Sequence, residues 1–443
     1  KTGGITISHL RFGDKPIRSP YYINQADFVA CHNPSYVVNG YKMVQDVKPG
    51  GVFMINCQWS DEELDKHMPA ESKKYIADNN IQLYTINAID KAIEIGMGKR
   101  TNTILQSAFF KLANIMPIEE AVDYMKAAAK KSYSKKGDAV VEMNYKAIDA
   151  GVGATHKVEI PASWANPEAD APKPELSGRP ATVKMVKDIM EPVNKMDGDS
   201  LPVSAFVGNI DGQWETGASA YEKRGTAVTV PEWDPEKCIQ CNQCSYVCPH
   251  AAIRPVAMTE AEAAKAPEGM QMKDLNQMPG YKFAIVVSAF DCTGCGSCVN
   301  VCPDKVQAIT MTGFEAHEDE QKYFDYAVSL EDKEDVIEKF KLNSVKGSQF
   351  RQPLLEFSGA CGGCGETPYA KLITQLFGDR MYIANATGCS SIWANSSPST
   401  PYTTNKKGHG PAWSNSLFED AAEFGYGMLL AQKAIRKRLK EEV

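Results

Sequence analysis

Two cysteine runs in the middle of the chain constrain its fold more than any other feature. They occupy residues 238–249 and 292–303, and together they hold eight of the thirteen cysteines. Both runs read C-x2-C-x2-C-x3-C-P. At this spacing, the first three thiolates of a run can surround one corner of a metal–sulfur cube, while the fourth reaches away past the proline. The doubled pattern implies that each run supplies the ligand that the other lacks.

Two [4Fe–4S] clusters follow from this doubled spacing. One cluster is assigned to Cys238, Cys241, Cys244 and Cys302, and the other to Cys292, Cys295, Cys298 and Cys248. Zinc is the alternative, because paired C-x2-C motifs also build four-cysteine zinc sites. A zinc site would use four of these thiolates and leave the extra cysteine and the proline of each run unexplained. The spacing therefore favours clusters.

The composition of the chain is typical of a globular protein with several domains. Of its 443 residues, 43% are hydrophobic and 23% are charged, and this length predicts about three domains. The net charge of −7 argues against nucleic acid as a partner. No apolar run reaches the roughly 18 residues of a membrane span and no signal peptide begins the chain, so we expect no membrane partner. The metal-type cysteine spacing indicates a reducing, cytoplasmic compartment.

The first 160 residues alternate short apolar runs with helical patterns. Strands are expected over residues 28–31, 51–57 and 81–86, and helices over 36–47, 61–79, 90–114 and 117–132. Ser60 with Glu63 predicts a capping box at the second helix. Strands that alternate with helices imply a doubly wound parallel sheet covered on both faces. Such a sheet binds ligands beyond the carboxyl ends of its strands.

The next part of the chain is expected to hold a linker and small module (161–220) and then an α+β domain (221–335). Five prolines between residues 161 and 180 predict an extended linker that does not pack, and a short helix is expected over 182–190. Each cysteine run is followed by an Ala-Ile pair, Ala252-Ile253 or Ala308-Ile309, which we expect to start a strand or helix over its cluster. The insertion at 254–291 is either a lid that tunes the clusters or a surface excursion.

A third cysteine group lies in the glycine-rich region that begins near residue 336. Cys361 and Cys364 form a C-x2-C pair among glycines, and Cys389 follows in Thr387-Gly388-Cys389. A C-x2-C pair can be a thioredoxin-like redox motif, and three thiolates leave a cube one ligand short. By the residues alone, either a ligand beyond the sequence completes a cluster or there is no cluster. The region ends in a helix expected over 421–439, whose basic end we interpret as solvated.

Taken together, these motifs resemble the pyruvate:ferredoxin oxidoreductase family over nearly the whole chain. Residues 3–13 (GGITISHLRFG) are similar to its coenzyme A-handling domain, and the two cysteine runs to its inserted ferredoxin-like domain. Residues 359–369 (GACGGCGETPY) and 385–390 (NATGCS) are similar to the beginning of its thiamine diphosphate domain. The resemblance implies a multidomain α/β protein. Its domains would be a coenzyme A-handling α/β domain (1–160), the linker and module (161–220), a ferredoxin-like domain with two clusters (221–335) and the start of an α/β thiamine diphosphate-binding domain (336–443).

The resemblance also implies residues for three kinds of cofactor or co-substrate. Cys361, Cys364 and Cys389 would bind a third [4Fe–4S] cluster close to thiamine diphosphate. Glu366, Thr387, Gly388 and Cys389 would lie near the thiamine cofactor itself. The candidates for coenzyme A are Lys1, Ser8, Asn102 and Asn144, because a lysine suits a phosphate and asparagine amides can bond the pantetheine arm. The alternative for these four is ordinary surface polarity.

The function that the resemblance implies is the oxidative decarboxylation of pyruvate to acetyl-CoA and CO2, a reversible reaction. Electrons would pass one at a time through three [4Fe–4S] clusters to an external ferredoxin or flavodoxin, in a cytoplasmic homodimer. Two alternatives stay open: a sister 2-oxoacid:ferredoxin oxidoreductase with another keto acid, or a polyferredoxin-like electron-transfer subunit without chemistry of its own. The thiamine-type stretch at 359–369 argues against the second alternative.

Several parts of the family's pattern do not occur in this sequence. They are the Gly-Asp-Gly segment that holds Mg2+ and the diphosphate, the domain with the glutamate that activates thiamine, and the fourth ligand of the third cluster. Because the chain begins with Lys1 rather than Met, we expect it to be a segment of a longer polypeptide that carries these parts. The catalytic acid/base residue is therefore unknown from this sequence.

Overall fold

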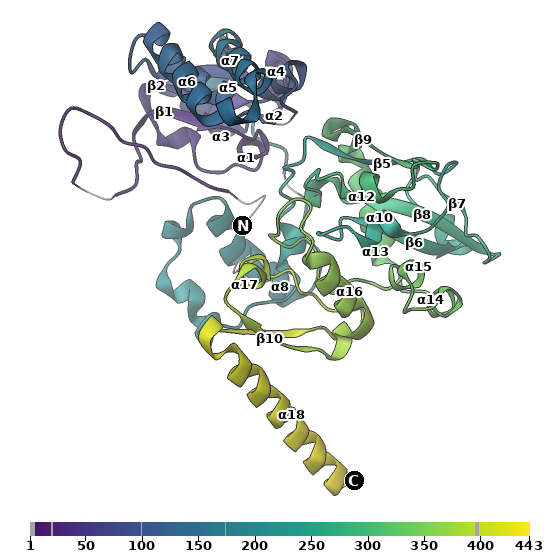
Figure 1. Ribbon diagram of the computed structural model, residues 1–443. Helices are drawn as coiled ribbons and strands as arrows, with labels where there is room; N and C mark the ends of the chain where they lie inside the picture. Colours follow the sequence, from purple (N-terminus) through teal and green to yellow (C-terminus); the bar gives the residue numbers. More distant parts are fainter. Residues whose placement is uncertain (1–4, 19–20, 99, 173, 395–397) are drawn as a thin grey trace. The chain divides into compact units, whose positions relative to one another are not determined.

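The structure is a computed structural model that describes residues 5–18, 21–98, 100–172, 174–394 and 398–443. These residues form two compact units, and the chain passes between them more than once (Figure 1). The first unit consists mainly of residues 176–192 and 201–443, and the second of residues 6–175 and 193–200. Within the described residues, no helix is both long and apolar enough to cross a membrane.

The second unit is built on a four-stranded sheet in the order β1-β2-β3-β4. β1 (Ala26–Cys31), β2 (Val47–Asn56) and β3 (Gln82–Ile86) are parallel, and the short β4 (His156–Lys157) pairs antiparallel with β3. The three predicted strands are therefore confirmed. The strand order follows the sequence, so the reversal of order that a doubly wound sheet contains is not found among the described strands.

Helices cover both faces of this sheet, as predicted. They are α1 (Ser35–Val38), α2 (Asp61–His67), α3 (Ala70–Asp78), α4 (Ala88–Ile95), α5 (Asn102–Ala113), α6 (Ile118–Tyr133) and α7 (Asp138–Gly153). Side chains of β2 alternate between the two faces. Phe53 packs in a cluster with Leu64 of α2 and Ile76 of α3. Met54 packs in a different cluster, with Ile104 of α5 and residues of α4 and α7.

Glycine and proline interrupt three helices that the hydrophobic pattern predicts as continuous. The helix predicted over 36–47 is broken into α1 and a short 3-10 helix at Val44–Asp46, because the chain turns at Gly40, where φ is +71°. Pro69 separates α2 from α3, and Gly96, with φ of +90°, ends α4 before α5 begins. The capping box at Ser60 and the helix over 117–132 are confirmed. α7 is a helix that the sequence analysis did not predict.

The proline-rich stretch that follows β4 packs against the second unit, contrary to the prediction of a free linker. Trp164 is only 2% exposed, and its indole N–H donates to the Asp65 carboxylate at 2.6 Å. The Ala70 N–H donates to Asp170 at 2.9 Å. A large apolar side chain among the prolines therefore anchors this stretch on α2 and α3.

The cysteine runs lie beside two small antiparallel sheets in the first unit. β5 (Thr229–Trp233) pairs with β9 (Ile309–Gly313), and β6 (Ile253–Thr259) pairs with β8 (Tyr281–Val287), which also pairs with β7 (Lys273–Asp274). Both Ala-Ile pairs start a strand, as predicted. The helices here are α10 (Gln243–Tyr246), α11 (Glu260–Ala263), α12 (Ser297–Val301), α13 (Gln321–Ser329), α14 (Glu334–Phe340) and α15 (Val345–Ser348).

The insertion between the cysteine runs is part of the hydrophobic core of this unit. It supplies β6, β7 and β8, and its Met258 and Phe283 are completely buried. Its β7 segment also reaches the first cysteine run, because the Lys273 ammonium donates to the Cys238 carbonyl oxygen at 3.2 Å. The insertion is therefore not a surface excursion.

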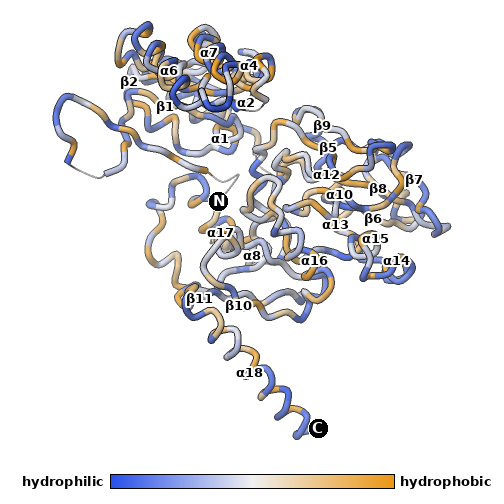
Figure 2. The backbone as a smooth tube through the Cα atoms, in the orientation of Figure 1, coloured by the Kyte–Doolittle hydropathy of each residue, from blue (hydrophilic) through white to orange (hydrophobic). Residues whose placement is uncertain are grey.

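The other α-helices and strands among the described residues are α8 (Pro180–Met185), α9 (Glu191–Asn194), α16 (Thr367–Phe377), β10 (Tyr382–Ala386), α17 (Cys389–Ala394), β11 (Ala412–Ser416) and α18 (Ala421–Glu442). The helix expected over 182–190 is confirmed, since α8 continues as a π-helix to Met190. β10 and β11 form a parallel pair. α18 confirms the helix expected over 421–439, and polar and apolar residues are mixed along it (Figure 2).

Candidate iron–sulfur centres

The two cysteine runs begin with the same backbone conformation. Gln240 and Gly294 each follow the opening cysteine of a run by two positions, and their φ angles are +59° and +62°. The Gln240 N–H donates to Cys238 Sγ at 3.4 Å, and the Gly294 N–H donates to Cys292 Sγ at 3.3 Å. A backbone N–H directed at sulfur stabilises a thiolate, and such bonds are one of the terms that set a cluster's reduction potential.

Four cysteines from both runs line a single cavity. Cys248 of the first run shares this cavity with Cys292, Cys295 and Cys298 of the second, in a space of about 370 Å³ that is partly open to solvent. Burial raises the pKa of the Cys292 thiol, and the nearby Cys248 sulfur raises it further. Burial likewise raises the pKa of Cys298 to about 12. Bound metal would ionise these thiols, and this is the set predicted for one cluster.

Three of the four cysteines predicted for the other cluster, Cys238, Cys241 and Cys244, lie close together. Burial raises the pKa of the Cys244 thiol, and the nearby sulfurs of Cys298, Cys238 and Cys241 raise it further. Cys302 accepts a backbone N–H hydrogen bond at 3.3 Å, and its place in this set stays a prediction. Because Cys298 belongs to the other set, the two sets adjoin where α10 packs against α12.

The described residues hold no group of three or more His, Cys, Asp or Glu side chains arranged to hold a single metal ion. The choice between zinc and clusters therefore rests on the spacing of the cysteines along the chain.

The third cysteine group lies directly beside the second run. A Cβ placed on Gly362 would lie 3.5 Å from the Cβ of Cys295, so the loop from Cys361 to Cys364 passes next to a predicted cluster ligand. The Glu366 N–H donates to Cys364 Sγ at 3.4 Å, which repeats the N–H to sulfur pattern of the two runs. The local geometry of this loop is therefore also suited to thiolates.

Cys389 belongs to a helix that packs against this loop. It begins α17 and is exposed. The Gly359 N–H donates to the carbonyl oxygen of Trp393 in the same helix at 3.3 Å. Trp393 also shares a hydrophobic cluster with Ala360 and Cys364. The helix of Cys389 is thus held against the C-x2-C loop, while iron ligation by its sulfur stays a prediction.

The other residues predicted near thiamine lie at two element ends in the same unit. Thr387 and Gly388 follow the carboxyl end of β10, and the Thr387 hydroxyl donates to the Ser416 carbonyl oxygen at 3.2 Å. Glu366 is exposed just before α16. The neighbouring Thr367 hydroxyl is buried and has no hydrogen-bond partner in the described residues. A buried polar atom without a partner is one that a bound group could satisfy.

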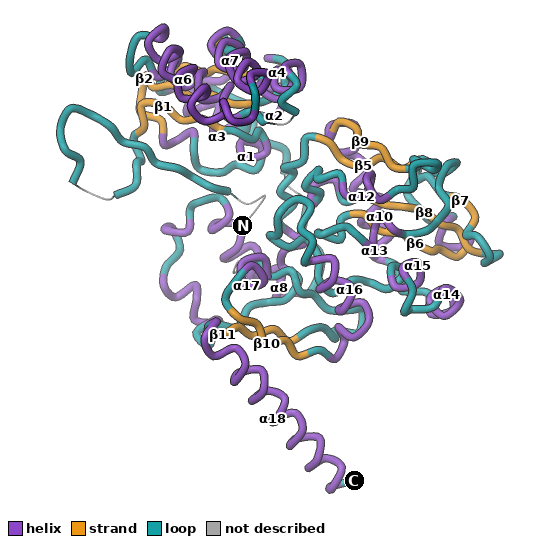
Figure 3. Tube along the Cα trace, viewed as in Figure 1, coloured by secondary structure: helices purple, strands orange, loops and turns teal. Residues whose placement is uncertain are grey.

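The described residues among those predicted to contact coenzyme A lie in different parts of the second unit, and their role stays a prediction. Lys1 lies outside the described residues, and Ser8 is exposed. The described chain before β1 is drawn as loop in Figure 3. Asn102 is exposed at the start of α5. Asn144 is only 4% exposed; its amide donates to a carbonyl of its own helix at 2.8 Å and accepts from the Thr103 hydroxyl at 3.4 Å. The amide nitrogen and oxygen of Asn144 therefore both form hydrogen bonds within α7 or between α7 and α5.

Polar residues at the carboxyl ends of the parallel strands were absent from the predicted site. Asn56 ends β2, and its amide donates to the His32 carbonyl oxygen at 3.1 Å and accepts from the Ala88 N–H at 3.0 Å. Gln58 donates to Asp90 at 2.7 Å. Each of these groups lies at the end of a predicted strand or shortly after it, so the rule that ligands bind at this edge could have selected them.

Sequence reasoning also missed Lys371, which is buried beside the first cysteine run. Its side chain is 2% exposed, and burial lowers its pKa to about 8. A lysine within an amphipathic helix normally faces solvent. No sequence signal therefore distinguishes it from the exposed lysines of the chain.

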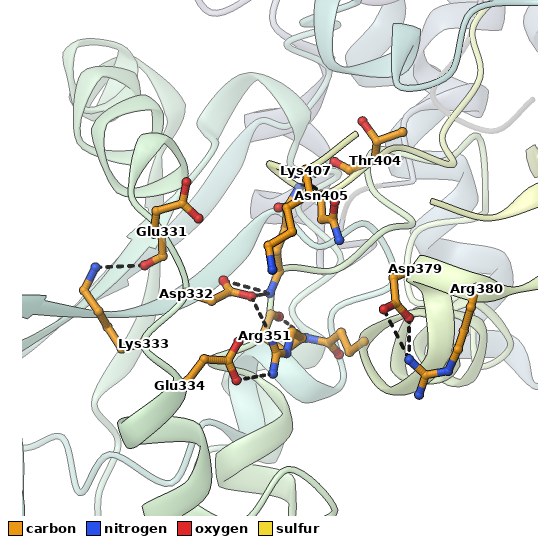
Figure 4. Close-up of polar contacts among 12 residues, drawn as sticks. Glu331, Asp332, Lys333, Glu334, Arg351, Asp379, Arg380, Thr404, Asn405 and Lys407 are labelled. Carbon is orange, nitrogen blue, oxygen red and sulfur yellow. Dashed lines mark hydrogen bonds and ion pairs between the residues drawn. The ribbon is translucent and has the colours of Figure 1, made fainter. Parts of the chain in front are cut away.

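A larger recess of the first unit is occupied by paired charges. It measures about 600 Å³, much of it open to solvent, and its walls include Asp332, Lys333 and Arg351. Arg351 donates to Glu334 at 2.6 Å and lies 3.5 Å from Asp332 (Figure 4). Burial raises the pKa of Asp332. Because these charges satisfy one another, the recess gives no specific indication of a ligand.

Comparison with known proteins identifies the class of the cysteine-rich region. Residues 237–306 match the family model described as a 4Fe-4S dicluster domain. Residues 1–154 match the model described as pyruvate ferredoxin/flavodoxin oxidoreductase, and residues 169–227 match a domain of unknown function. The chain is thus part of an iron–sulfur oxidoreductase that carries a dicluster domain.

Curated relatives give the family. The chain is 52% identical over its whole length to the pyruvate-flavodoxin oxidoreductase of Klebsiella pneumoniae, and it covers 37% of that protein. It is 53% identical, over 97% of its length, to the pyruvate:ferredoxin oxidoreductase of Moorella thermoacetica, of which it covers 36%. It is also 47% identical to the pyruvate dehydrogenase [NADP(+)] of Cryptosporidium parvum, of which it covers 24%. The chain belongs to the pyruvate:ferredoxin/flavodoxin oxidoreductases as a central segment. It spans little more than a third of the length of the Klebsiella and Moorella proteins.

Proposed function

We propose that the whole protein oxidatively decarboxylates pyruvate to acetyl-CoA and CO2, and that this segment carries the electrons away. They pass one at a time through three [4Fe–4S] clusters to an external ferredoxin or flavodoxin. Thiamine diphosphate, held with Mg2+ by residues outside this segment, supplies the electron sink when bound. The segment's own residues bind the clusters and set their spacing and potentials.

The observation that carries this proposal is the cavity shared by the two cysteine runs. Cys248 comes from the first run, yet it lines the same space as Cys292, Cys295 and Cys298. That exchange is what the doubled motif requires of a two-cluster domain, and a zinc site or a set of buried thiols has no need of it. The exchange ties the two clusters into one rigid unit.

The contact between the third cysteine loop and Cys295 gives the proposed order of transfer. Gly362 lies next to Cys295, which belongs to the cluster of the second run. A third cluster on Cys361, Cys364 and Cys389 would therefore be adjacent to that cluster. Electrons would then reach the cluster of Cys238 last, and it would be the one that reduces the external carrier.

The remaining assignments belong to the same proposal. Residues 1–160 would handle coenzyme A with a doubly wound sheet, residues 161–220 would be the linker and small module, and residues 336–443 would begin the thiamine domain. The orphaned Thr367 hydroxyl beside Glu366 supports a bound group at that end of α16. We further expect a cytoplasmic homodimer.

Two other functions remain candidates. A sister enzyme would use another keto acid. The electron acceptor could also differ, because a similar segment occurs in a relative named pyruvate dehydrogenase [NADP(+)]. A non-catalytic electron-transfer subunit would lack thiamine diphosphate. A substrate panel and a thiamine assay on the whole protein separate these functions.

The ligand exchange is tested by a pair of serine substitutions in the holoenzyme. Cys248→Ser and Cys295→Ser should disturb the same cluster, although the two residues lie in different runs. The double variant should then lose no more than one cluster, or about four irons. Low-temperature EPR of the reduced protein should show the same undisturbed signals in all three variants.

The control is Cys57→Ser, because Cys57 is buried in the second unit and outside both predicted sets. This variant should keep every cluster. Loss of two distinct clusters in the double variant would show that each run binds its own cluster, and stable zinc in place of iron would refute the clusters altogether.

Cys389 is tested separately. Cys389→Ala should remove the third cluster and leave the two clusters of the dicluster domain, since those depend on other thiolates. Pyruvate should then no longer reduce the remaining clusters, whereas a chemical reductant should. Unchanged reduction by pyruvate would show that Cys389 is only a structural thiol.

A further inference from the structure

The Lys371 side chain lies inside the first unit, against the first cysteine run. It projects from α16 and is 2% exposed. Its ammonium group donates to the carbonyl oxygens of Ser245, of Tyr246 at 3.3 Å and of Cys248 at 3.4 Å. The three donors of the ammonium group therefore meet three backbone acceptors that follow Cys244 and include the ligand Cys248.

The charge of Lys371 has no carboxylate to balance it among the described residues. The ionisable side chains close enough to act on it are Cys248, Arg254 and Cys244. Arg254 is itself a cation, and it is paired with Glu356. A buried cation is stable only when an anion or a set of dipoles compensates it. The carbonyl dipoles supply part of this compensation, and the thiolates of Cys244 and Cys248 would supply the rest once they bind iron.

Cys244 and Cys248 belong to different predicted clusters. Cys244 is a ligand of the first cluster, and Cys248 is the ligand that the first run gives to the second. Lys371 thus lies at the point where the chain leaves one cluster for the other. A cluster bound by thiolates is anionic and becomes more so on reduction, and the net charge around a cluster sets its potential.

We propose that Lys371 is the shared counter-charge of both clusters, a positioning residue that holds the end of α10 and raises both reduction potentials. The positive charge stabilises the reduced cluster more than the oxidised one. No bond forms or breaks in this role, because each cluster only gains or loses an electron. The proposal rests on the two clusters of the proposed function.

Lys273 serves as a comparison within the same protein, because it contacts the first cysteine run at its opening. Its ammonium donates to the Cys238 carbonyl oxygen at 3.2 Å and to the Pro235 carbonyl oxygen at 2.5 Å. Both contacts are at the opening of the first run. The charge of Lys273 should therefore act on the first cluster, whereas that of Lys371 should act on both.

The test is redox titration of the holoenzyme, followed by EPR, with cluster content measured as iron and acid-labile sulfide. Lys371→Gln keeps a hydrogen-bond donor and removes the charge, and Lys371→Met removes both. Each substitution should lower both cluster potentials by about 59 mV, which corresponds to about a tenfold change in the equilibrium constant of one-electron reduction. Lys371→Arg should stay close to the native values. Lys273→Met should lower only one potential.

Lys406→Met is the matched control, because the Lys406 ammonium donates to the Val328 carbonyl oxygen at 2.6 Å in α13. It should leave both potentials unchanged. Native potentials in a loaded Lys371→Gln or Lys371→Met variant would overturn the proposal.

If neither neutral variant retains clusters, the arginine variant decides: native potentials support the counter-charge and shifted ones overturn it. Absence of iron from the native protein would instead refute the proposed function.

Discussion

The guanidinium of Arg254 donates to the carboxylate of Glu356 where both side chains are nearly buried, with exposures of 10% and 13%. Arg254 starts the insertion between the cysteine runs, and Glu356 precedes the third cysteine group. The guanidinium also lies 5.0 Å from the ring centre of Phe324 and 5.4 Å from that of Phe357. One ion pair therefore joins the dicluster region to the segment that leads to Cys361.

Glu356→Ala should destabilise the first unit by about 3–5 kcal/mol, because it leaves the Arg254 guanidinium buried without its anion. Hydrogen exchange of β6 peptides in increasing denaturant should measure this loss. The control is Asp379→Ala, which breaks the exposed pair of Asp379 with Arg380 (Figure 4). That change should cost no more than about 1 kcal/mol. Equal effects of the two changes would mean that burial of the Arg254 pair is unimportant.

Gly151 should not tolerate a side chain. A Cβ at this position in α7 would overlap Ser107 Oγ and the Ile104 carbonyl oxygen of α5. Gly151→Ala should therefore destabilise the second unit by about 1–3 kcal/mol. Gly153→Ala lies two positions later, where no atom comes within 4 Å of the added Cβ, and it should be neutral or stabilising by up to about 1 kcal/mol. Thermal unfolding of the two variants would compare them directly, and similar behaviour would contradict the close packing of α5 on α7.

The stability of the second unit should depend on the charge of Asp65. Hydrogen bonds from the Lys73 ammonium and the Trp164 indole hold the pKa of Asp65 below its usual range. A depressed pKa means that this stabilisation is complete above the unfolded-state pKa of about 3.9 and is lost as the pH falls through the folded value. Asp65→Ala should cost about 1–3 kcal/mol at neutral pH, since it leaves the buried indole N–H without a partner.

The stability difference between native protein and Asp65→Ala should therefore stay constant above about pH 4 and shrink as the pH falls through the lower, folded-state pKa of Asp65. The exposed pair of Lys74 with Asp78 supplies the control, and Asp78→Ala should change stability by less than about 1 kcal/mol at any pH. A difference between native protein and Asp65→Ala that stays constant below about pH 4 as well would show that the carboxylate charge contributes nothing.

The two asparagines proposed for coenzyme A should behave differently. Asn102→Ala, at an exposed position, should weaken coenzyme A binding by a few-fold, for a loss of about 0.5–1.5 kcal/mol, with little change in stability. Asn144→Ala should instead lower stability by about 1–3 kcal/mol, because it leaves the Thr103 hydroxyl without its partner. Calorimetric titration of coenzyme A and thermal unfolding of the whole protein measure both quantities. Weaker binding only in the Asn144 variant would reverse the assignment.

Local rules predicted the strands well and the helix ends poorly. β1, β2 and β3 are apolar runs bounded by polar residues, so their positions follow from composition. The helices were predicted too long because periodicity continues across Pro69 and Gly96, while the backbone does not. Trp164 shows the opposite error, since prolines around it suggested a free linker, and burial of one indole holds it in place.

The candidate site was predictable where spacing along the chain defines it. Motif spacing alone put Cys248 with Cys292 in one ligand set, and both line one cavity. Lys371 was not predictable, because its role depends on where α16 packs, more than a hundred residues beyond the first run. The contact of Asn144 with α5 was not predictable for the same reason: an amide in a helical pattern gives no sign of whether it faces a ligand or the next helix.

The return of residues 193–200 to the second unit determines how the protein can be taken apart. The Lys42 N–H donates to the Lys195 carbonyl oxygen at 3.0 Å, so this short piece is held by the unit that the chain had already left. A protease that cuts once between residues 176 and 192 would leave the two fragments associated, and they would elute together from a sizing column. A second cut, beyond residue 200, would leave this short piece with the second unit. A gene fragment that ends near residue 175 would likewise yield a second unit that lacks residues 193–200.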